Sequence, residues 1–490
     1  MRVAVIGSGL GGLACALRLQ AAGHDVTVLE QRATPGGRAS QITDGGYTWD
    51  TGPSLITMPW VLEDTFEAAG LDLWRELELT RLDPLYRIHW ADEPRAFDFT
   101  DDVDRLREQV ARFSERDAAR VPAFLDALRP IYEQAIVGAG RRDFGSARAF
   151  AGLLPMMLRL RAAEPLHAFV SRFFAHERVR EAFSFHSLFI GGDPFRVPAV
   201  YGALVYLQVL DGGWYAAGGV YSLVEALARP LDVRCDAPVE AIEATNARVT
   251  GVRLVTGERI RADVVVSNAD VLRTNELLGR REPVRRLRPT MSCFLLYLGT
   301  DRAFDERLLH HTLLVGHGYR DFIRTVTRGP ALPTSFSTYV HAPARTEPGM
   351  AAAGGDSLCI LLPVPNLKHA PVDWAREGDR LRDAVVADLE TTFGLTGLEA
   401  AVRVEHRMDP ADFERELGAR WGNAFAIEPT LRQSAYLRPP NRHKRVRGLY
   451  LTGGGTHPGA GIPGVLLGAE VTAGLVTADH PAPRSTVAVP

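Results

Sequence analysis

Two glycine-rich turns near opposite ends of the 490-residue chain carry residue types that suit a phosphate-bearing ligand. The first is Gly7-Ser-Gly-Leu-Gly-Gly12, and the second occupies residues 452–464, with Pro463 near its end. Glycines let a ligand approach the backbone closely, and proline suits a first helical turn because it needs no N–H partner there. A helix beginning at each turn would offer free N–H groups and its positive dipole end to an anion. The two turns therefore predict two anion-binding loops.

The elements around the first turn follow the order that positions a dinucleotide. The apolar run at residues 3–6 predicts a strand, and residues 13–22 predict a helix. Residues 25–29 predict a second strand, which ends at Glu30. Together these elements predict one strand–helix–strand unit with a nucleotide at its turn.

Each glycine in this unit has a defined role in such a fold. Gly7 would form the tight turn, Gly9 would admit the pyrophosphate, and Gly12 would let the helix pack on the strand. Glu30 stands where an acid bonds a ribose hydroxyl. The alternative is an ordinary glycine turn without a ligand, and the complete order of strand, helix, strand and acid argues against it.

A third glycine turn, Gly36-Gly37-Arg38, follows Glu30, and Gly52-Pro53-Ser54 comes shortly after it. This third turn places a guanidinium near the predicted pyrophosphate, where bidentate pairing is favoured. The alternative is a surface turn with a solvated arginine.

These motifs resemble those of bacterial phytoene-desaturase-type carotenoid desaturases, which belong to the FAD-dependent carotenoid/retinoid oxidoreductases and share their FAD signature with amine oxidases. The resemblance runs in one order from about residue 3 to about residue 476. Besides the glycine turns, the matching segments are residues 182–195, 267–270, 310–312, 339–343, 363–365, 433–436 and 452–464.

The resemblance implies FAD as the cofactor and assigns residues to it. The implied cofactor-binding residues are Gly7, Ser8, Gly9, Leu10, Gly11, Gly12, Glu30, Gln31, Gly37, Arg38, Gly52, Pro53, Ser54, Val239, Gly454, Gly455, Pro463, Gly464 and Val465. Val239 would contact the adenine through its backbone, and an ordinary core valine is the alternative. His457, within the second turn, is either a proton acceptor or a histidine that bonds its own loop.

The implied reaction is FAD-dependent desaturation of a carotenoid precursor, with phytoene as the expected substrate, by hydride transfer from the polyene to flavin N5. A later-acting desaturase on a hydroxylated or C30 carotenoid and a carotene isomerase are alternatives. A flavin- or carotenoid-binding protein without turnover is another. No catalytic residue and no metal site is assigned.

A polyene has no charge to anchor it, so we expect an apolar channel that binds by burial. Dense aromatic residues suggest its wall, although they would equally suit an ordinary core. The channel candidates are Phe183, Phe185, His186, Phe189, Trp214 and Tyr215, with Phe195, Tyr201 and Tyr206 nearby. His186 could instead be a satisfied buried histidine.

Two stretches depart from the family pattern. The chain reads Trp-Tyr-Ala-Ala-Gly-Gly-Val at residues 214–220, where related desaturases carry Trp-Phe-Pro-Arg-Gly-Gly-Thr. Ala149 and Gly152 stand where some members carry an acid and an arginine. The number and position of new double bonds are therefore left open.

Length and composition bound the architecture and the class of partner. A chain of this length exceeds what one core supports, so two domains are expected. A formal net charge of −3 gives no reason to expect nucleic acid. Four scattered cysteines without metal-ligand spacing favour a reducing cytoplasm. Neither a signal peptide nor a membrane-spanning run is expected.

The cofactor motifs divide the chain into an α/β fold of two domains. Residues 1–75, 215–275 and 425–480 would form a Rossmann-type FAD-binding domain assembled from three segments. Residues 76–214 and 276–424 would form an α+β domain that binds the polyene and contacts the membrane, and 481–490 would be a disordered tail.

The substrate class implies contact with a bilayer. Residues 150–161 mix bulky apolar side chains with arginines, as interfacial segments do, and Arg148 precedes them. A helix covering the substrate domain is the alternative. We expect a cytoplasmic protein peripherally associated with the cell membrane. Oxygen or a membrane quinone is the expected electron acceptor, since no separate NAD site is visible.

Overall fold

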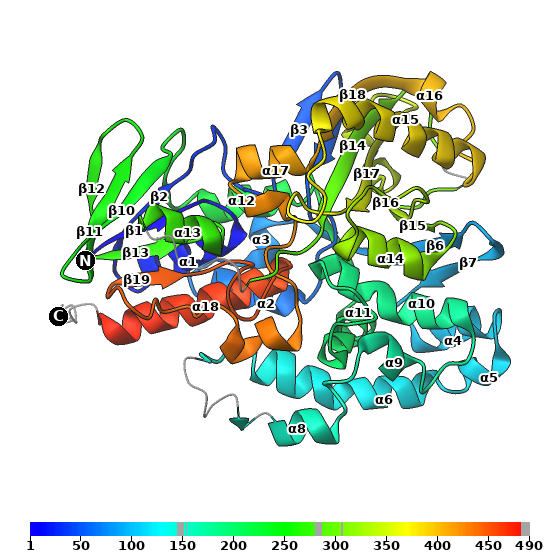
Figure 1. The fold of residues 1–490 in the computed structure, drawn as a ribbon, viewed down its shortest axis with the longest axis horizontal. Coiled ribbons are helices and arrows are strands. Elements are labelled where there is room, and N and C mark those ends of the chain that lie inside the picture. The colour runs from blue at the N-terminus through cyan, green and yellow to red at the C-terminus, as the bar shows by residue number, and fades with distance from the viewer. Residues whose placement is uncertain (145–150, 153, 280–286, 305–306, 482–490) are drawn as a thin grey trace.

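Two regions lie side by side in the computed structural model, which describes residues 1–144, 151–152, 154–279, 287–304 and 307–481. Figure 1 shows one region with the N-terminus and a parallel sheet crossed by the long helix α18 (Ile462–Asp479). The other region has a larger sheet above a layer of helices. The mixture of parallel sheet, antiparallel sheet and helices confirms the predicted α/β class.

A five-stranded parallel sheet forms the centre of the first region, with the strand order β19-β13-β1-β2-β9. Its strands are short and rich in valine and leucine, as expected for strands that are covered on both faces. They are β1 (Arg2–Ile6), β2 (Asp25–Leu29), β9 (Asp232–Arg234), β13 (Val264–Ser267) and β19 (Leu449–Leu451). Segments separated by hundreds of residues thus meet in one sheet.

The two helices that begin at the glycine turns pack on this sheet and on each other. Helix α1 (Leu10–Ala21) packs on α18 and on α12 (Tyr221–Ala228). A small antiparallel sheet, β10 (Val239–Thr245), β11 (Arg248–Leu254) and β12 (Arg259–Arg261), flanks the parallel one. Helix α1 begins at Leu10, three residues before the predicted start at residue 13, and ends at Ala21, next to the predicted end.

Helix α18 is the one helix in the described ranges that is long and apolar enough to cross a membrane, and half of it is buried. Its contacts with α1 and α2 (Pro59–Glu67) account for apolar residues on these sides. Glycines and a glutamate interrupt the apolar residues of α18, so it does not contain the uninterrupted apolar run that would predict a membrane span from the sequence.

A seven-stranded mixed sheet dominates the second region, with the order β18-β14-β17-β16-β15-β6-β7. Its strands are β6 (Tyr86–Trp90), β7 (Glu93–Phe99), β14 (Ser292–Thr300), β15 (His311–Val315), β16 (Thr338–His341), β17 (Asp356–Val364) and β18 (Val402–Met408). All pairs are antiparallel except β15 with β6. The central strands are buried along nearly their whole length.

Two short antiparallel pairs form small sheets of their own. The hairpin β3 (Gln41–Asp44) and β4 (Tyr47–Asp50) packs on β17, and β5 (Leu79–Leu82) pairs with β8 (Gly213–Ala216). The helices around the larger sheet are α14 (Tyr319–Arg328), α15 (Trp374–Thr391), α16 (Leu398–Ala401) and α17 (Pro410–Leu417). In the first region α3 (Leu73–Glu76) packs on α2, and α13 (Val271–Leu277) packs on β10.

A layer of helices lies below the larger sheet in Figure 1. It comprises α4 (Val103–Ala111), α5 (Glu115–Ala118), α6 (Val121–Ile131), α8 (Leu154–Arg159), α9 (Leu166–Val170), α10 (Glu177–Ser184) and α11 (Ala203–Asp211). A π-helical turn, Tyr132–Gly138, continues α6. The predicted domain boundaries stay predictions. Arg148, Ala149, Phe150 and tail residues 482–490 lie outside the described residues.

Candidate functional site

A cavity of about 750 Å³ extends from the glycine turns of the parallel sheet to the larger sheet. At one end it is lined by Gly9, Glu30 and Arg38, and at the other by Phe322 and Tyr339. The cavity lies beyond the carboxyl ends of the parallel strands, where ligands bind in open α/β sheets. The two anion-binding loops predicted from the sequence thus open into one space.

The first glycine turn is built for close approach. Gly7 has a φ of +90° and donates its N–H to the carbonyl of Leu29 at 2.8 Å. A Cβ on Gly12 would overlap the carbonyl oxygen of Gly7, and a Cβ on Gly9 would stand 3.0 Å from Asn268 Nδ2. The turn therefore leaves bare backbone facing the cavity.

Glu30 is fixed beneath the first turn by three donors. Its Oε2 accepts hydrogen bonds from the Ser8 N–H (2.9 Å) and Ser8 Oγ (2.6 Å). Its Oε1 accepts from the Arg32 N–H at 3.0 Å. Glu30 lines the cavity while Ser8 lies behind it, so Ser8 orients the carboxylate rather than facing a ligand.

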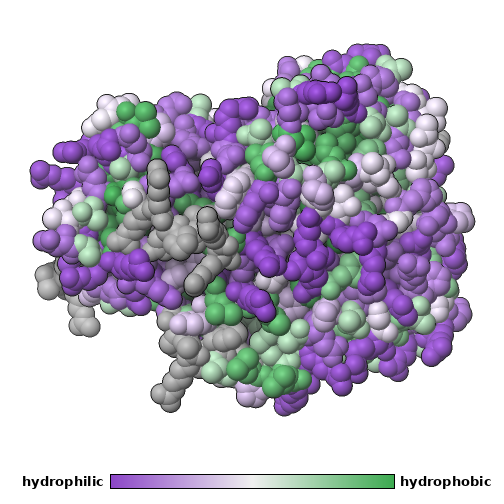
Figure 2. Space-filling view, viewed as in Figure 1, coloured by the Kyte–Doolittle hydropathy of each residue, from purple (hydrophilic) through white to green (hydrophobic). Residues whose placement is uncertain are grey.

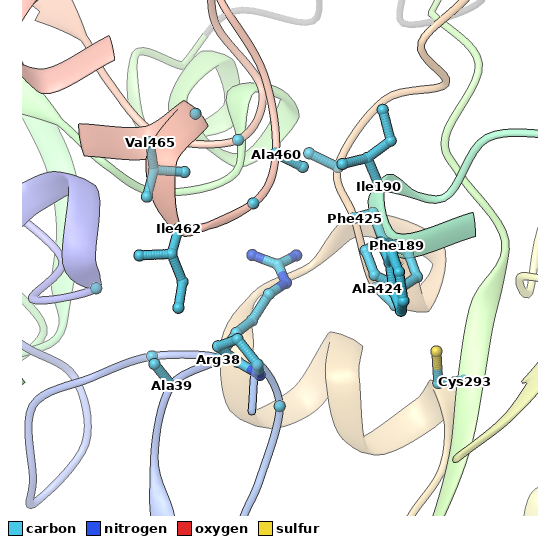
Figure 3. A pocket seen from close by; sticks show the side chains of 18 of the residues that line it. Arg38, Ala39, Phe189, Ile190, Cys293, Ala424, Phe425, Ala460, Ile462 and Val465 are labelled. Atoms are coloured by element: carbon cyan, nitrogen blue, oxygen red, sulfur yellow. The ribbon is translucent and has the colours of Figure 1, made fainter. Parts of the chain in front are cut away.

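Arg38 places a cation against the cavity. Its Nη2 donates to the carbonyl and Oδ1 of Asn423, both at 3.2 Å, and Asn423 in turn donates to Asp270. Its buried Nε has no hydrogen-bond partner in the part of the chain that the structure describes. Burial lowers the pKa of Arg38, and the nearby Asp270 opposes that shift. Figure 3 shows the guanidinium directed toward Ile462 and Val465.

The second glycine turn ends in a helix start without a side-chain cap. Gly461, with a φ of +97°, is the N-cap of α18, and no side chain bonds the first N–H groups. Buried Arg438 holds the loop by donating to the carbonyls of Gly454 (2.6 Å) and Thr456 (2.8 Å). The helix therefore points free N–H groups and positive dipole toward the cavity.

His457 fills neither of the roles expected from the sequence. Its Nε2 donates to the carbonyl of Ala139, 3.0 Å away. His457 therefore links the second turn to the end of the π-helical turn Tyr132–Gly138 and not to its own loop. Burial lowers the pKa of His457 to about 4. It is not among the residues that line the cavity.

The cavity fits a ligand with a dinucleotide at one end. Two helix starts lack side-chain caps, Arg38 keeps an orphaned buried N–H, and glycines fill positions where a Cβ would intrude. The predicted cofactor residues that line it are Gly7, Gly9, Leu10, Gly11, Glu30, Gln31, Gly37, Arg38, Gly52, Pro53, Ser54, Val239, Gly454, Pro463, Gly464 and Val465.

Three predicted cofactor residues lie behind the wall for packing reasons. Ser8 bonds Glu30, as described above. Gly12 allows α1 to approach β1, and a Cβ on Gly455 would overlap Val271. These three positions shape the turns, and contact of the other residues with FAD stays a prediction.

The aromatic candidates divide into wall and core. Phe185, Phe189 and Tyr201 line the cavity, and Figure 3 shows Phe189 beside Phe425. Phe183 does not line it, because it is enclosed by other phenylalanines, with Phe174 stacked 4.9 Å away. Phe195 and Tyr206 also lie outside the wall.

Three further channel candidates are corrected in the same way. His186 is fully buried and its Nε2 lies 2.7 Å from the Tyr86 hydroxyl, so it is a core histidine outside the cavity wall. Trp214 pairs with Arg81 in the β5–β8 ladder and donates to Asp211. Tyr215 turns away from the cavity and donates to Glu347 at 2.7 Å.

The altered stretch at residues 214–220 therefore supports the site from outside. Asp50 accepts hydrogen bonds from the N–H groups of Val220 (2.8 Å) and Tyr221 (3.3 Å), which start α12. A Cβ on Gly219 would crowd the Asp50 carboxylate. Burial raises the pKa of Asp50 to about 7.

Several lining residues were not assigned to the site from the sequence. Asn268 lies between the two glycine turns, with its Oδ1 near Gly453 and its Nδ2 3.4 Å from the Gly7 carbonyl. Others lie on the larger sheet or near it, such as Leu313, Tyr339 and Phe425. Asn268 directly follows a buried strand, and Tyr339 lies in a segment that resembles the desaturase family. Both features could have assigned these residues to the site from the sequence.

Comparisons with known proteins agree with this geometry. A family model described as flavin containing amine oxidoreductase matches residues 10–477. A phytoene desaturase (lycopene-forming) from Pseudescherichia vulneris is 39% identical, over 98% of this chain and 99% of the relative. A zeta-carotene-forming phytoene desaturase from Myxococcus xanthus is 37% identical, over 100% of this chain and 97% of the relative.

The solved structures support the fold. A putrescine oxidase variant superposes with a TM-score of 0.65, over 98% of this chain and 99% of the oxidase. Its sequence is 15% identical, so this likeness concerns the fold alone.

Proposed function

The chain belongs to the family of flavin-containing amine oxidoreductases, and on that basis we propose that it desaturates phytoene. It is an FAD-dependent oxidoreductase of the phytoene-desaturase type, and its substrate is a hydrophobic polyene. The observation that carries the proposal is the continuity of the cavity from the dinucleotide cradle to an apolar chamber.

The chamber can hold a hydrocarbon by burial. The lining side chains from α11, α14, β15 and β16 are apolar or neutral: Leu204, Leu207, Gln208, Tyr319, Phe322, Leu313, Leu314, Val315, Thr338 and Tyr339. At roughly 25 cal/mol per Å² of buried apolar surface, a long polyene needs no charged anchor. This wall would hold the chain of the substrate in line with the cradle.

The residues around the cradle suit negative charge. When bound, the flavin supplies the acceptor for a hydride from the polyene. Arg38 and the start of α18 would stabilise negative charge at that end of the cavity, because a buried guanidinium and a helix N-terminus both attract anions. The apolar side chains opposite exclude water from the same space.

Production in cells that accumulate only phytoene tests this function. We expect long-wavelength polyene absorption in pigment extracts, and the band positions would count the new double bonds, since the two relatives above form different products. Unchanged phytoene, with conversion only of a later carotenoid, would contradict the substrate. A cis-to-trans change without added double bonds would indicate isomerisation instead.

We further propose that the protein is cytoplasmic and docks on the membrane surface through α8. Leu158 is 75% exposed and Leu154 45% exposed, beside Arg159. Figure 2 shows hydrophobic side chains gathered at the lower edge of the molecule, where Figure 1 places α8. Exposed leucines flanked by arginines suit an anionic lipid surface.

Vesicle flotation with anionic lipids tests the docking surface. Leu158→Asp should reduce the bound fraction, whereas Val255→Asp, at a residue 63% exposed in the other region, should not. Equal binding by both variants would exclude α8 as the docking surface.

As electron acceptor we propose oxygen or a membrane quinone, and anaerobic turnover with and without a quinone distinguishes the two.

A further inference from the structure

Three buried histidines gather behind the cavity wall on the larger sheet. His311 begins β15 and His341 ends β16, and the antiparallel register places the two directly opposite each other. His310 precedes His311, and nitrogen atoms of the three imidazoles lie within 4.8 Å of one another. Tyr339 is two residues before His341 and therefore shares its face of the strand.

Hydrogen bonds connect this cluster with the cavity. Tyr339 Oη lies 2.6 Å from His311 Nδ1 and 2.8 Å from Ser54 Oγ. Both Ser54 and Tyr339 line the cavity, and Ser54 belongs to the loop that follows the Arg38 turn. A phenol in the cavity wall is thus bonded directly to a buried imidazole.

The other side of the cluster leads toward the surface. His310 Nε2 lies 3.2 Å from His341 Nε2, and His310 Nδ1 lies 2.6 Å from the hydroxyl of Thr346. Thr346 is partly exposed, whereas His310, His311 and His341 are buried. Among the residues that the structure describes, His311 Nε2 has no hydrogen-bond partner, and it faces a cluster of ring nitrogens close enough for one water to bridge.

The three histidines are uncharged at neutral pH and can therefore accept a proton. Burial lowers the pKa of His310 to about 3 and holds the pKa values of His311 and His341 well below the ordinary value. Burial also raises the pKa of Tyr339. At neutral pH the imidazoles are therefore uncharged, and the phenol keeps its proton and can donate it to His311 Nδ1.

We propose that the Tyr339–His311 pair takes the proton that the polyene loses during desaturation, with the His310–His341 pair as its route toward the surface. The inference rests on the proposed function. After hydride removal the polyene is a cation, and the C–H bond next to it breaks so that its electron pair forms the new C=C bond. The proton moves to Tyr339 Oη, as the phenol proton moves to His311 Nδ1.

A weakly basic acceptor is sufficient for this step. A proton next to a carbocation is strongly acidic, so a neutral imidazole behind a phenol can remove it. The low pKa of the buried imidazole then favours rapid onward transfer, because an imidazolium is unstable in that environment. In this step Tyr339 is the catalytic residue, and His311 is a positioning residue that acts through it.

Tyr339→Phe and His311→Gln test the proposal in single turnovers of flavin-loaded enzyme, with a carotenoid that the wild type converts. Loss of a positioned proton acceptor should slow product formation by roughly 100-fold. With substrate deuterated at the carbon that loses the proton, both variants should show a larger isotope effect than the wild type. Imidazole added to His311→Ala should restore part of the rate.

Tyr86 and His186 provide a matched control. They also form a short phenol–imidazole hydrogen bond, 2.7 Å from Tyr86 Oη to His186 Nε2, in the core outside the cavity wall, and Tyr86 donates to Gln208. Tyr86→Phe and His186→Gln remove comparable atoms and should leave the isotope effect unchanged. Flavin absorbance verifies that each variant keeps its cofactor and its fold.

Two readouts that do not depend on turnover complete the test. ¹⁵N spectra of histidine-labelled protein should show His311 neutral at pH 7 with Nδ1 unprotonated, and Tyr339→Phe should shift that signal. A protonated Nδ1 would overturn the proposal. One metal ion per chain that is lost in His311→Gln would also overturn it, because the imidazoles would then be ligands.

The outcomes separate this inference from the proposed function. A wild type that converts no carotenoid contradicts the function and, with it, the inference that rests on it. A wild type that turns over beside equally active Tyr339→Phe and His311→Gln variants contradicts the inference alone.

Discussion

The two ends of the cavity differ in the kind of atoms that line them, which are mostly backbone at one end and side chains at the other. The cofactor end consists largely of backbone, with glycines at Gly7, Gly9 and Gly461 and two helix starts without side-chain caps. The substrate end consists of side chains from strands and helices that are far apart in the sequence. One end is specified by local turns, and the other by the way distant elements pack.

This difference bears on how each end tolerates change. The glycine turns have little room for any added atom, so a larger side chain in them should abolish cofactor binding. An apolar wall binds by area, so replacing one side chain should change affinity by a graded amount. Four experiments test the two ends and the contact between the two regions, and the largest expected effect comes first.

Gly9→Val should abolish cofactor binding. A Cβ at Gly9 would stand 3.0 Å from Asn268 Nδ2, and the remaining valine atoms would enter the cradle. We expect flavin affinity to fall by more than roughly 100-fold, or about 3 kcal/mol. The ratio of flavin to protein absorbance after purification measures it. Gly474→Ala, at a site in α18 where a Cβ meets nothing within 4 Å, is the control.

Asp50→Asn tests the joint between the two regions through pH. Burial raises the pKa of Asp50 to about 7, above its ordinary value of 3.8, so the folded chain binds this proton more tightly than the unfolded chain. The contribution of Asp50 to stability is therefore present at low pH and is lost as pH rises toward 7. Because asparagine does not ionise, the free energy of unfolding of the variant relative to wild type should rise by about 2–4 kcal/mol between pH 4 and 7.

Denaturant titration across this range, with constant excess flavin, measures the difference for Asp50→Asn. Val255→Ala, at an exposed residue that does not ionise, should give a flat difference over the same range. A flat difference for Asp50→Asn as well would show that the folded protein does not raise the pKa of this carboxylate.

Glu30→Gln should weaken the cofactor end without abolishing it. The carboxylate is held by Ser8 and Arg32 at the edge of the cavity, where the predicted ribose hydroxyls would bond it. Loss of a charged hydrogen-bond acceptor should cost about 1.5–3 kcal/mol of flavin affinity, and calorimetric titration measures it. Glu240→Gln, on the exposed face of β10, should bind flavin normally; equal weakening would remove Glu30 from the site.

Phe189→Leu and Phe183→Leu compare wall with core at the substrate end. Phe189 lines the cavity, so its replacement should raise KM several-fold, or about 1 kcal/mol, while flavin content stays unchanged. Phe183 is enclosed in the phenylalanine cluster, so its replacement should lower the melting temperature and leave KM alone. Equal shifts of KM in the two variants would contradict the assignment of wall and core.

The same contrast explains how far the sequence could predict the site. Local spacing identified the Gly7 turn, Glu30, Arg38 and the turn before α18, because a tight turn and a helix start depend on neighbouring residues. It placed His186 and Trp214 in the channel, since aromatic density is the same in a wall and in a core. Only the register of β15 with β16 brings Tyr339 and His311 together.

The wider fold follows the same division. The strand–helix–strand unit and the class were predictable from periodicity and turn residues. The order of the seven-stranded sheet was not, since parallel pairing of β15 with β6 depends on contacts more than 200 residues apart in the chain.

The place of β19 and α18 in the chain sets an order on synthesis. The ribosome delivers β1, β2, β9 and β13 before residue 449, so until then β13 is the open edge of the sheet, with its outer N–H and C=O groups unpaired. The helix start at Ile462 emerges later still. A cofactor site that uses the start of α18 is therefore complete only after the residues up to 465 have left the ribosome. A nascent chain stalled earlier presents a sheet edge prone to aggregation instead of a closed cofactor site.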